Sequence, residues 1–236
     1  MPVMPAQLDH LALVRATTTI KPVPMVPEIL LHLSSDAISL WERTEQELRE
    51  SDRQPPFWGF AWAGGQALAR YVLDHPQVTA GRRVLDLGSG SGLTAIAAAM
   101  TGAVSVLASE LDPIAITAIS LNAALNNVEI STTGDLLDTD GGDAEVILAA
   151  DIWYERQLSA RALRLLRQAT ARGATVLAGD VGRAFLPREH MRDLAAYDIP
   201  VVAELEDAEV KRTLVMTLAR TASPQPCTGL PSQAPE

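Results

Sequence analysis

The clearest pattern in the chain is an apolar run at residues 84–87 that ends in a glycine-rich segment and continues into an alanine-rich one. A short apolar run of this kind is typical of a parallel strand covered on both faces. Residues 94–100 have high helix propensity, and Gly102 stands where a helix often ends. The pattern predicts a strand, a tight turn and a helix, which form the nucleotide-binding half of a doubly wound α/β fold.

Apolar runs and helical periodicity alternate along the rest of the chain. Further buried strands are expected at residues 104–108, 128–132, 146–150 and 174–178. Amphipathic helices are expected from Pro113 and from Leu158 to Ala169. A helix at 187–196 and an antiparallel pair of strands at 199–202 and 213–218 complete the pattern. The alternation predicts an α/β fold, a doubly wound seven-stranded sheet whose last strand is antiparallel.

The two ends of the chain depart from this pattern. Residues 1–53 are expected to form an N-terminal extension packed on a main domain of residues 54–220. Within the extension we expect a short helix near residues 8–14, an extended connection through three prolines, a strand at 29–33 and a helix at 38–49. Residues 221–236 contain four prolines and few apolar side chains, so a disordered tail is expected.

Composition narrows the classes of partner. The 236 residues are 47% hydrophobic and carry a formal net charge of −10. An acidic surface repels phosphate backbones, so we expect no nucleic-acid partner and favour one that presents lysine or arginine. Cys227 is the only cysteine, which excludes an internal disulfide and a thiolate metal site, and no metal is expected. Without a long apolar run or a visible targeting segment, we expect a cytoplasmic protein that does not enter a membrane.

The glycine turn indicates which ligand the fold would hold. It has the pattern D-x-G-x-G-x-G, with Asp86 followed by Gly88, Gly90 and Gly92. A dinucleotide site needs G-x-G-x-x-G, and Leu93 stands where the third glycine belongs. The turn instead resembles motif I of the class I S-adenosylmethionine-dependent methyltransferases. S-adenosylmethionine carries an ammonium and a sulfonium but no pyrophosphate, so a carboxylate such as Asp86 is useful beside the turn.

Acidic residues downstream are placed for the rest of such a cofactor. Glu110 ends the strand at 104–108, about 20 residues past the turn, where a carboxylate can accept both hydroxyls of a ribose. Asp112 precedes Pro113 and is expected to cap the next helix. Asp135 follows the next strand and is placed to accept the adenine amino group, although a structural turn aspartate is nearly as good an interpretation. Cofactor contacts are also expected from three neighbours of these segments, Ser89, Leu136 and Ala150.

An aromatic segment precedes the glycine turn. Two phenylalanines and two tryptophans, Trp62 among them, lie within residues 57–62, and Gly64 and Gly65 follow at the start of an expected helix. One interpretation is a hydrophobic anchor that holds the extension to the core. The other is a lid on the cofactor, because aromatic faces attract a sulfonium and glycine leaves amide donors accessible. On the second interpretation Trp62, Gly64 and Gly65 contact the cofactor.

Acidic and aromatic residues follow the strand at 146–150. The tetrapeptide Asp151-Ile152-Trp153-Tyr154 lies at the carboxyl edge of the predicted sheet, where ligands of such folds bind. Asp151 and Tyr154 are the candidate catalytic residues, and together with Trp153 they are expected to contact the substrate. Arg183, in a later loop at the same edge, either contacts substrate or forms a surface salt bridge, which is the commoner role.

Several segments together resemble the seven-β-strand protein lysine methyltransferases. The shared features are the glycine turn, Glu110, the segment N-A-A-L-N-N at 122–127, and an acid, two variable residues and a tyrosine at 151–154. Segments at 26–29, 57–58, 62–71 and 179–183 are similar to the enzymes that methylate the β-subunit of electron-transfer flavoprotein. The likeness covers roughly residues 8–219. Val181, where proline is expected, and Trp153 depart from the family pattern.

The resemblance implies an S-adenosylmethionine-dependent N-methyltransferase that acts on lysine of a protein, with the electron-transfer flavoprotein β-subunit as the expected partner. In that reaction a neutral lysine amine attacks the methyl group in line, Asp151 orients the ammonium beforehand and water takes its proton. The residues by themselves imply only a methyltransferase. Another protein, such as a ribosomal protein, and a small-molecule amine stay open as substrates; a non-catalytic binding module and a dinucleotide-dependent oxidoreductase are the competing classes.

Overall fold

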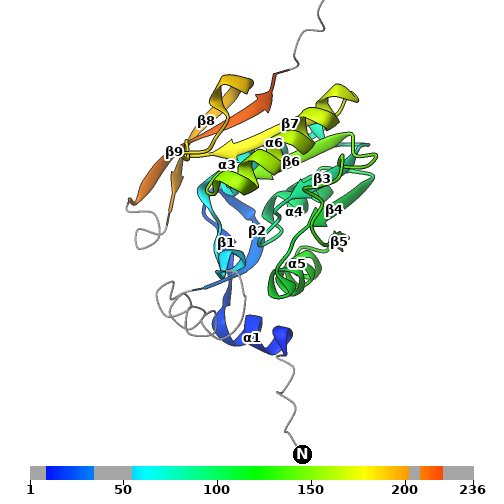
Figure 1. Cartoon of the computed structure of the whole chain (residues 1–236). Helices are drawn as coiled ribbons and strands as arrows, with labels where there is room; N and C mark the ends of the chain where they lie inside the picture. Colours follow the sequence, from blue (N-terminus) through cyan, green and yellow to red (C-terminus); the bar gives the residue numbers. More distant parts are fainter. Residues whose placement is uncertain (1–8, 35–54, 202–207, 220–236) are drawn as a thin grey trace, which may run out of the picture.

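The structure is a computed structural model that describes residues 9–34, 55–201 and 208–219. Seven strands form one sheet in the order β5-β4-β3-β6-β7-β9-β8, with helices on its faces (Figure 1). The strands of this sheet are β3 (Arg83–Leu87), β4 (Ser105–Ser109), β5 (Ser131–Thr133), β6 (Val146–Ala150), β7 (Thr175–Asp180), β8 (Met191–Pro200) and β9 (Val210–Leu218). The α-helices are α1 (His10–Thr17), α3 (Ala63–Asp74), α4 (Leu93–Met100), α5 (Pro113–Leu125) and α6 (Arg156–Ala171).

The strand order places a switch point beside β3. Strands β3, β4 and β5 run outward in parallel, and the chain then returns to pair β6 with the other side of β3. Strand β7 continues in parallel, whereas β9 pairs antiparallel with β7 and β8 antiparallel with β9. The expected doubly wound, seven-stranded α/β sheet with an antiparallel end is confirmed. In such sheets a ligand binds outside the carboxyl ends of the strands at the switch point.

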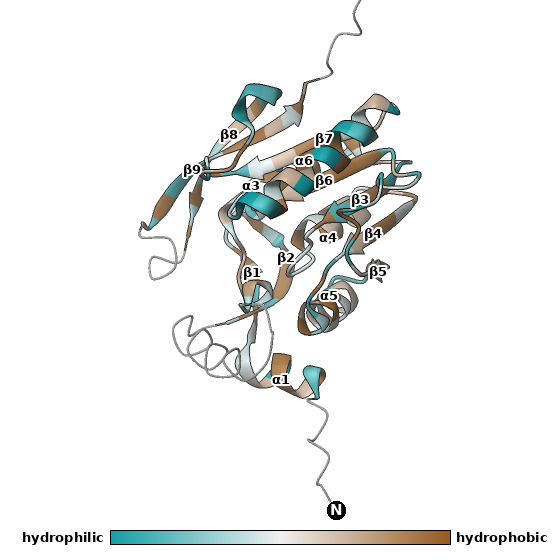
Figure 2. Cartoon of the chain, in the orientation of Figure 1, coloured by the Kyte–Doolittle hydropathy of each residue, from teal (hydrophilic) through white to brown (hydrophobic). Residues whose placement is uncertain are grey.

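Side chains of the central strands alternate between two hydrophobic clusters. Val84 of β3 packs with residues of α3, α4 and α5, while the next residue, Leu85, packs with residues of α6. Val146 and Ile147 of β6 divide in the same way. This follows from the two-residue period of a strand. Figure 2 shows the resulting distribution, with apolar residues concentrated in the central strands and polar residues on outer turns of α3 and α6.

A two-stranded hairpin connects the N-terminal region to the core. Strands β1 (Thr19–Val23) and β2 (Val26–Leu33) pair antiparallel, and the apolar residues of β2 join the cluster of α3, α4 and α5. Asn126, the residue that caps the C-terminus of α5, exchanges two hydrogen bonds with the backbone of Leu30, at 2.9 and 2.6 Å. Asn122 accepts from the N–H of His32 and donates to the carbonyl of Ser91 in the glycine turn. The two asparagines thereby tie the hairpin, α5 and the turn together.

The largest difference from the sequence expectation is at residues 187–196. We expected a helix there, but only a short 3-10 turn, η3 (Arg188–His190), is present. Residues 191–196 of the expected helix belong to strand β8 instead. Leucine, alanine and arginine favour a helix, yet β8 pairs with β9 along its whole length. Hydrogen bonding to a neighbouring strand has overridden a weak local propensity here.

Other boundaries differ less. Strand β5 begins at Ser131 instead of residue 128, and the expected proline-rich connection is the β1–β2 hairpin. The other short 3-10 segments are η1 (Phe57–Gly59) and η2 (Pro76–Val78). The helix expected at 38–49 and the tail at 221–236 lie outside the described residues.

Within the described ranges, no helix combines the length and apolar character needed to cross a bilayer. The same residues contain no group of three metal-ligating side chains.

Candidate functional site

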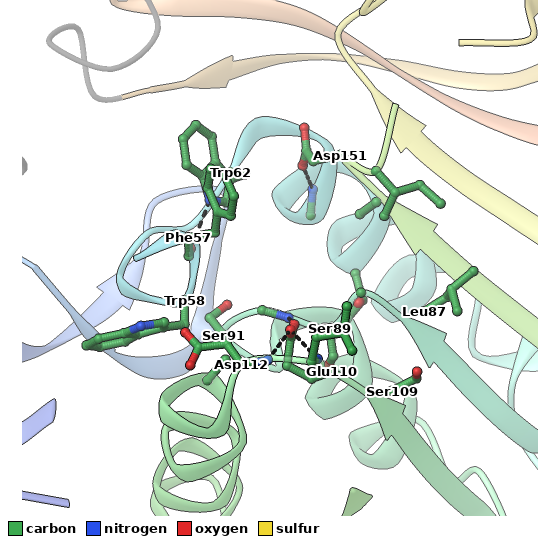
Figure 3. Close-up of a pocket in the computed structure, with 18 of the residues that line it drawn as sticks. Phe57, Trp58, Trp62, Leu87, Ser89, Ser91, Ser109, Glu110, Asp112 and Asp151 are labelled. Carbon is green, nitrogen blue, oxygen red and sulfur yellow. Dashed lines mark hydrogen bonds between the residues drawn. The ribbon is translucent and has the colours of Figure 1, made fainter. Parts of the chain in front are cut away.

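A cavity of about 340 Å³ opens at the carboxyl ends of β3, β4 and β6. This volume is in the range of small-molecule sites, and the position is the one that the strand order predicts for a ligand. Figure 3 shows Glu110 and Ser89 on one side of the cavity, with Trp62 and Asp151 opposite them. Side chains from four separate stretches of the sequence therefore surround one space.

Asp86 holds the glycine turn in place by hydrogen bonds to the turn and to the start of α4. Its carboxylate is buried and accepts hydrogen bonds from Ser89 Oγ at 2.5 Å, from Thr94 Oγ1 at 2.6 Å and from the N–H of Ala95 at 3.2 Å. Burial is the main cause of a raised pKa for Asp86, and the Ser89 and Thr94 hydroxyls act in the opposite direction. Asp86 does not line the cavity, so the geometry supports a role in shaping the turn, and the direct cofactor contact expected for it has no support here.

The turn itself exposes its backbone to the cavity. Gly88 and Gly90 have positive φ values of 67° and 55°, and both line the cavity together with Ser89. A Cβ on Gly88 would lie 3.0 Å from Ile152, whereas one on Gly90 would meet no atom within 4 Å. Gly92, also with positive φ, begins α4 behind the cavity wall. Glycine thus permits the left-handed backbone at each position and leaves space over Gly90 for a ligand.

Glu110 connects the turn after β4 to the glycine turn. Its Oε2 accepts from the N–H of Gly90 at 2.8 Å, and its Oε1 accepts from the N–H groups of Leu111 and Asp112 at 2.7 and 3.1 Å. The residue lines the cavity, as expected for a ribose ligand. Asp112 accepts from the N–H of Ile114 at 2.8 Å and caps α5, which confirms the expected capping role.

Asp135, in the turn after β5, is a further acid of the cavity lining. Asp135 lines the cavity, accepts from the N–H of Leu137 at 2.8 Å and pairs with Arg161 of α6 at 2.6 Å. Its position combines the two interpretations of the sequence, because it is both a turn aspartate and a cavity residue. Leu136 does not line the cavity, whereas Leu137, which was not singled out, does. Both leucines pack with the cluster that includes α6, and which of them also reaches the cavity could not be read from the sequence.

Aromatic residues cover the opening. The Phe57 ring lies 5.9 Å from Trp62 in an edge-on arrangement and 5.4 Å from Tyr154, measured between centroids. The indole N–H of Trp62 donates to the carbonyl of Phe57 at 2.9 Å. Phe57, Trp58 and Trp62 all line the cavity, so the aromatic segment faces the ligand space. Clustering of aromatic residues beside paired glycines was the signal for this wall, although Phe57 and Trp58 were not individually predicted.

The start of α3 meets the ends of β6 and β7. Gly65 lines the cavity, and its N–H donates to Asp151 Oδ2 at 2.8 Å. Gly64 does not line the cavity and instead packs against the backbone of Gly179. Ala150, at the end of β6, lines the cavity as expected. The expected cofactor contact of Gly64 is therefore replaced by a backbone contact that sets the position of α3.

The tetrapeptide after β6 divides between the cavity and the core. Asp151 and Tyr154 line the cavity, and Tyr154 is 48% exposed at its edge. Trp153 is fully buried among residues of β6, β7 and α6, and its indole nitrogen has no hydrogen-bond partner among the described residues. A substrate contact was expected for Trp153, but a side chain inside the core cannot reach the ligand, so its position assigns it to packing. Ile152, not singled out, lines the cavity in its place.

The residues around the cavity fit S-adenosylmethionine. The open backbone at Gly90 permits close approach, Glu110 offers carboxylate oxygens beside it, and the aromatic wall offers ring faces that attract a sulfonium. Asp135 offers a further acceptor at one end. The lining contains several acceptors and aromatic faces, and the glycine turn lacks the G-x-G-x-x-G spacing of a pyrophosphate site, which disfavours a dinucleotide.

Comparison with known proteins agrees with this geometry. Residues 66–170 match the family model "Ribosomal protein L11 methyltransferase (PrmA)". A Pyrococcus horikoshii structure provisionally described as an RNA methyltransferase superimposes with a TM-score of 0.52, covering 78% of this chain and all of that one at 14% identity, which supports the fold alone. The fold and the position of the cavity are those of the class I methyltransferases.

Curated relatives define the family more narrowly. The electron transfer flavoprotein beta subunit lysine methyltransferase of Mus musculus is 38% identical over 78% of this chain and 73% of its own length. The Rattus norvegicus protein of the same name is 41% identical over 75% of this chain and 71% of its own length. The chain belongs to the electron-transfer flavoprotein β-subunit lysine methyltransferase family, as its sequence motifs indicated.

Proposed function

We propose that the protein methylates lysine side chains of a protein substrate, and that this substrate is the β-subunit of electron-transfer flavoprotein. The observation that carries the proposal is the placement of Asp151 and the half-exposed Tyr154 in the wall of the same cavity that the glycine turn and Glu110 line. An acid and an aromatic residue at the opening suit a long aliphatic side chain that ends in an amine. The names of the relatives indicate which protein supplies it.

Named residues would hold the cofactor in this arrangement. Glu110 would bind the ribose hydroxyls, Asp135 the adenine amino group, and the backbone from Gly88 to Gly90 would lie along the cofactor. Trp62 and Gly65 would complete the site from the side of α3. When bound, S-adenosylmethionine supplies an electrophilic methyl group, which passes to a neutral amine as the carbon–nitrogen bond forms and the carbon–sulfur bond breaks.

The residues at the opening prepare the lysine. Asp151 would draw in the ammonium by a charge-assisted hydrogen bond and orient it, although a carboxylate favours the charged form. The pKa of Tyr154 is raised, mainly by burial and then by the charges of Glu110 and Glu155, so this phenol stays protonated near neutral pH and does not act as a base. The lysine proton therefore passes to water, and positioning of the amine supplies most of the rate enhancement.

The proposal is tested with labelled S-adenosylmethionine and purified electron-transfer flavoprotein. We expect label on the β-subunit, located on lysine by mass spectrometry, and calorimetric binding of S-adenosylmethionine without binding of NAD. Asp151→Asn should lower methylation at least about tenfold, equivalent to roughly 1.4 kcal/mol, while cofactor affinity is retained. Loss of affinity together with activity would make Asp151 a cofactor ligand, and full activity would remove its role.

A second candidate substrate has one observation in its favour. The family match at 66–170 and a Geobacillus thermodenitrificans relative, 48% identical over 36% of this chain, are both named as ribosomal protein L11 methyltransferases. That relative is covered over only 26% of its length, so the likeness extends over a minor part of that protein. Ribosomal protein L11 therefore serves as the comparison substrate in the same assay, and preferential labelling of it would overturn the flavoprotein assignment. The cytoplasmic location expected from the sequence stays a prediction.

A further inference from the structure

Arg183 brings a positive charge into the wall of the cavity. Its Nη1 lies 2.6 Å from Oδ1 of Asp151, with side chains 18% and 10% exposed respectively. The same nitrogen lies 3.6 Å from Oδ2 of the fully buried Asp180. Among the described residues that line the cavity, Arg183 is the one cation. This arrangement differs from the surface salt bridge that the sequence favoured, because the pair is largely shielded from water.

The turn that carries Arg183 is held in place by hydrogen bonds to the side chain of Asp180. Oδ1 of Asp180 accepts hydrogen bonds from the N–H groups of Gly182 and Arg183, both at 2.6 Å. Gly182 has a φ of 93°, a conformation that side chains with a Cβ rarely adopt. The backbone of Arg183 is therefore anchored at the end of β7, which limits the positions that its guanidinium can reach.

Asp151 is held by three neighbouring elements. Its N–H donates to the carbonyl of Gly179 in β7 at 3.0 Å, and its Oδ2 accepts from the N–H of Gly65 in α3. Its own φ is 57°, an unfavourable value for a residue other than glycine. A backbone conformation of this kind persists only where several surrounding contacts hold it. Residues in such conformations are concentrated at functional sites. The guanidinium of Arg183 provides the contact at Oδ1, on the cavity side of this arrangement.

We propose that Arg183 is a positioning residue for methyl transfer. It holds Asp151 in its strained orientation and offsets part of the carboxylate charge, so that a lysine bound beside Asp151 loses its proton to water more readily. A carboxylate alone favours the ammonium, whereas a guanidinium nearby favours the neutral amine that forms the new carbon–nitrogen bond. The inference rests on the lysine substrate proposed above and explains how an acid at the opening is compatible with attack by a neutral amine.

The other charged groups around this corner act against deprotonation. Glu110 lies in the turn after β4 and Glu155 at the start of α6, and both act on Tyr154, as does Arg183 with the opposite sign. Asp180 lies at the end of β7, and α3 contributes the uncharged N–H of Gly65. Several carboxylates thus lie near this corner of the cavity. If Arg183 is removed, no other cation among the described cavity-lining residues opposes their charge.

The experiment compares Arg183→Gln with Arg183→Lys and the wild-type chain. Single-turnover methylation of the flavoprotein β-subunit is measured against pH at saturating S-adenosylmethionine. We expect the midpoint of the rising limb to move about one unit higher in Arg183→Gln, so that the rate near neutral pH falls about tenfold and recovers at high pH. Arg183→Lys should keep the wild-type midpoint, and affinity for the cofactor, measured by calorimetry, should change less than about twofold in both.

Arg70→Gln is the matched control. Arg70 lies in α3, is also 18% exposed, and pairs with Glu28 and Asp74 away from the cavity. Its removal changes the net charge equally, and we expect an unaltered pH midpoint. A uniform loss at every pH in Arg183→Gln would mean a structural role, and a loss confined to cofactor affinity would make Arg183 a cofactor ligand; either result overturns the inference. If the wild-type chain does not methylate lysine, the proposed function fails before Arg183 is considered.

Discussion

Gly64 at the start of α3 and Gly179 near the end of β7 lie in direct backbone contact. A Cβ on either glycine would overlap the carbonyl group of the other, and a Cβ on Gly64 would also lie 2.6 Å from Oδ2 of Asp151. Because neither residue has a side chain, α3 approaches the sheet closely enough for Gly65 to donate to Asp151. The contact therefore links the packing of a helix to the geometry of a proposed catalytic residue.

Gly64→Ala is expected to destabilise the protein by about 1–3 kcal/mol, because the added methyl group must displace backbone atoms on the neighbouring strand. Gly65→Ala is the matched control. It lies in the same helix turn, and its Cβ would come no closer than 3.7 Å, to a side-chain atom of Leu93. Chemical denaturation should show Gly65→Ala near the wild type or more stable by up to roughly 1 kcal/mol. Equal stabilities for the two variants would show that α3 can move away from Gly179 without cost.

Thr94→Val tests the buried Asp86. The substitution keeps the side-chain shape but removes the hydroxyl that donates to Asp86 Oδ1 at 2.6 Å. Hydrogen bonds to a charged group contribute roughly 1.5–3 kcal/mol, and we expect the free energy of unfolding to fall by that amount. Thr117→Val on α5 is the control, since its exposed hydroxyl bonds only to the carbonyl of Pro113 among the described residues. A similar small loss in both variants would mean that the Thr94 bond is not important for the turn.

Glu110→Gln tests the ribose contact. Loss of one carboxylate oxygen also weakens the links to Gly90 and to the N–H groups after β4, so the variant should bind S-adenosylmethionine at least about tenfold more weakly, or roughly 1.4 kcal/mol. Glu129→Gln, at an exposed position outside the cavity, removes the same charge and should leave affinity unchanged. Calorimetric titration of both variants with S-adenosylmethionine measures these affinities. Wild-type affinity in Glu110→Gln would exclude Glu110 as a ligand.

The lowered pKa of His32 predicts that the free energy of unfolding depends on pH. Burial, and then the charge of Arg15, lower the pKa of His32, whose Nδ1 lies 3.1 Å from Thr18 Oγ1. A histidine with a lowered folded-state pKa binds a proton more readily when unfolded, so stability is lost as pH falls from the unfolded pKa of about 6.5 toward the folded one. Above this window the group contributes no pH dependence.

His32→Gln should remove that component. Between about pH 8 and 5, the melting temperature of the wild type should therefore fall by more than that of the variant as the pH falls through the window. Parallel curves at all pH values would show that His32 has the same pKa in the folded and unfolded states.

The order of elements around the glycine turn could be read from the sequence because the signals there are local. Residues 84–87 form an apolar run, glycines permit positive φ, and the Asp112 side chain caps the helix that begins at Pro113 by accepting from the N–H of Ile114. The position of Glu110 beside the turn follows from the parallel pairing of β3 and β4, which the apolar pattern already implied. Each of these features depends on neighbours in sequence or on the general geometry of a parallel sheet.

Tertiary structure decided the features that depend on distant neighbours. Residues 191–200 form a strand because β9 is available for pairing, and Trp153 is buried because the turn after β6 directs it under α6. Asp86 is turned away from the cavity by hydroxyl partners that no spacing rule identifies. The pairing of Arg183 with Asp151 joins residues 32 positions apart across two strand ends. The sequence by itself determined which residues reach the carboxyl edge of the sheet, whereas packing determined which way their side chains point, because that direction is set by the atoms across each contact.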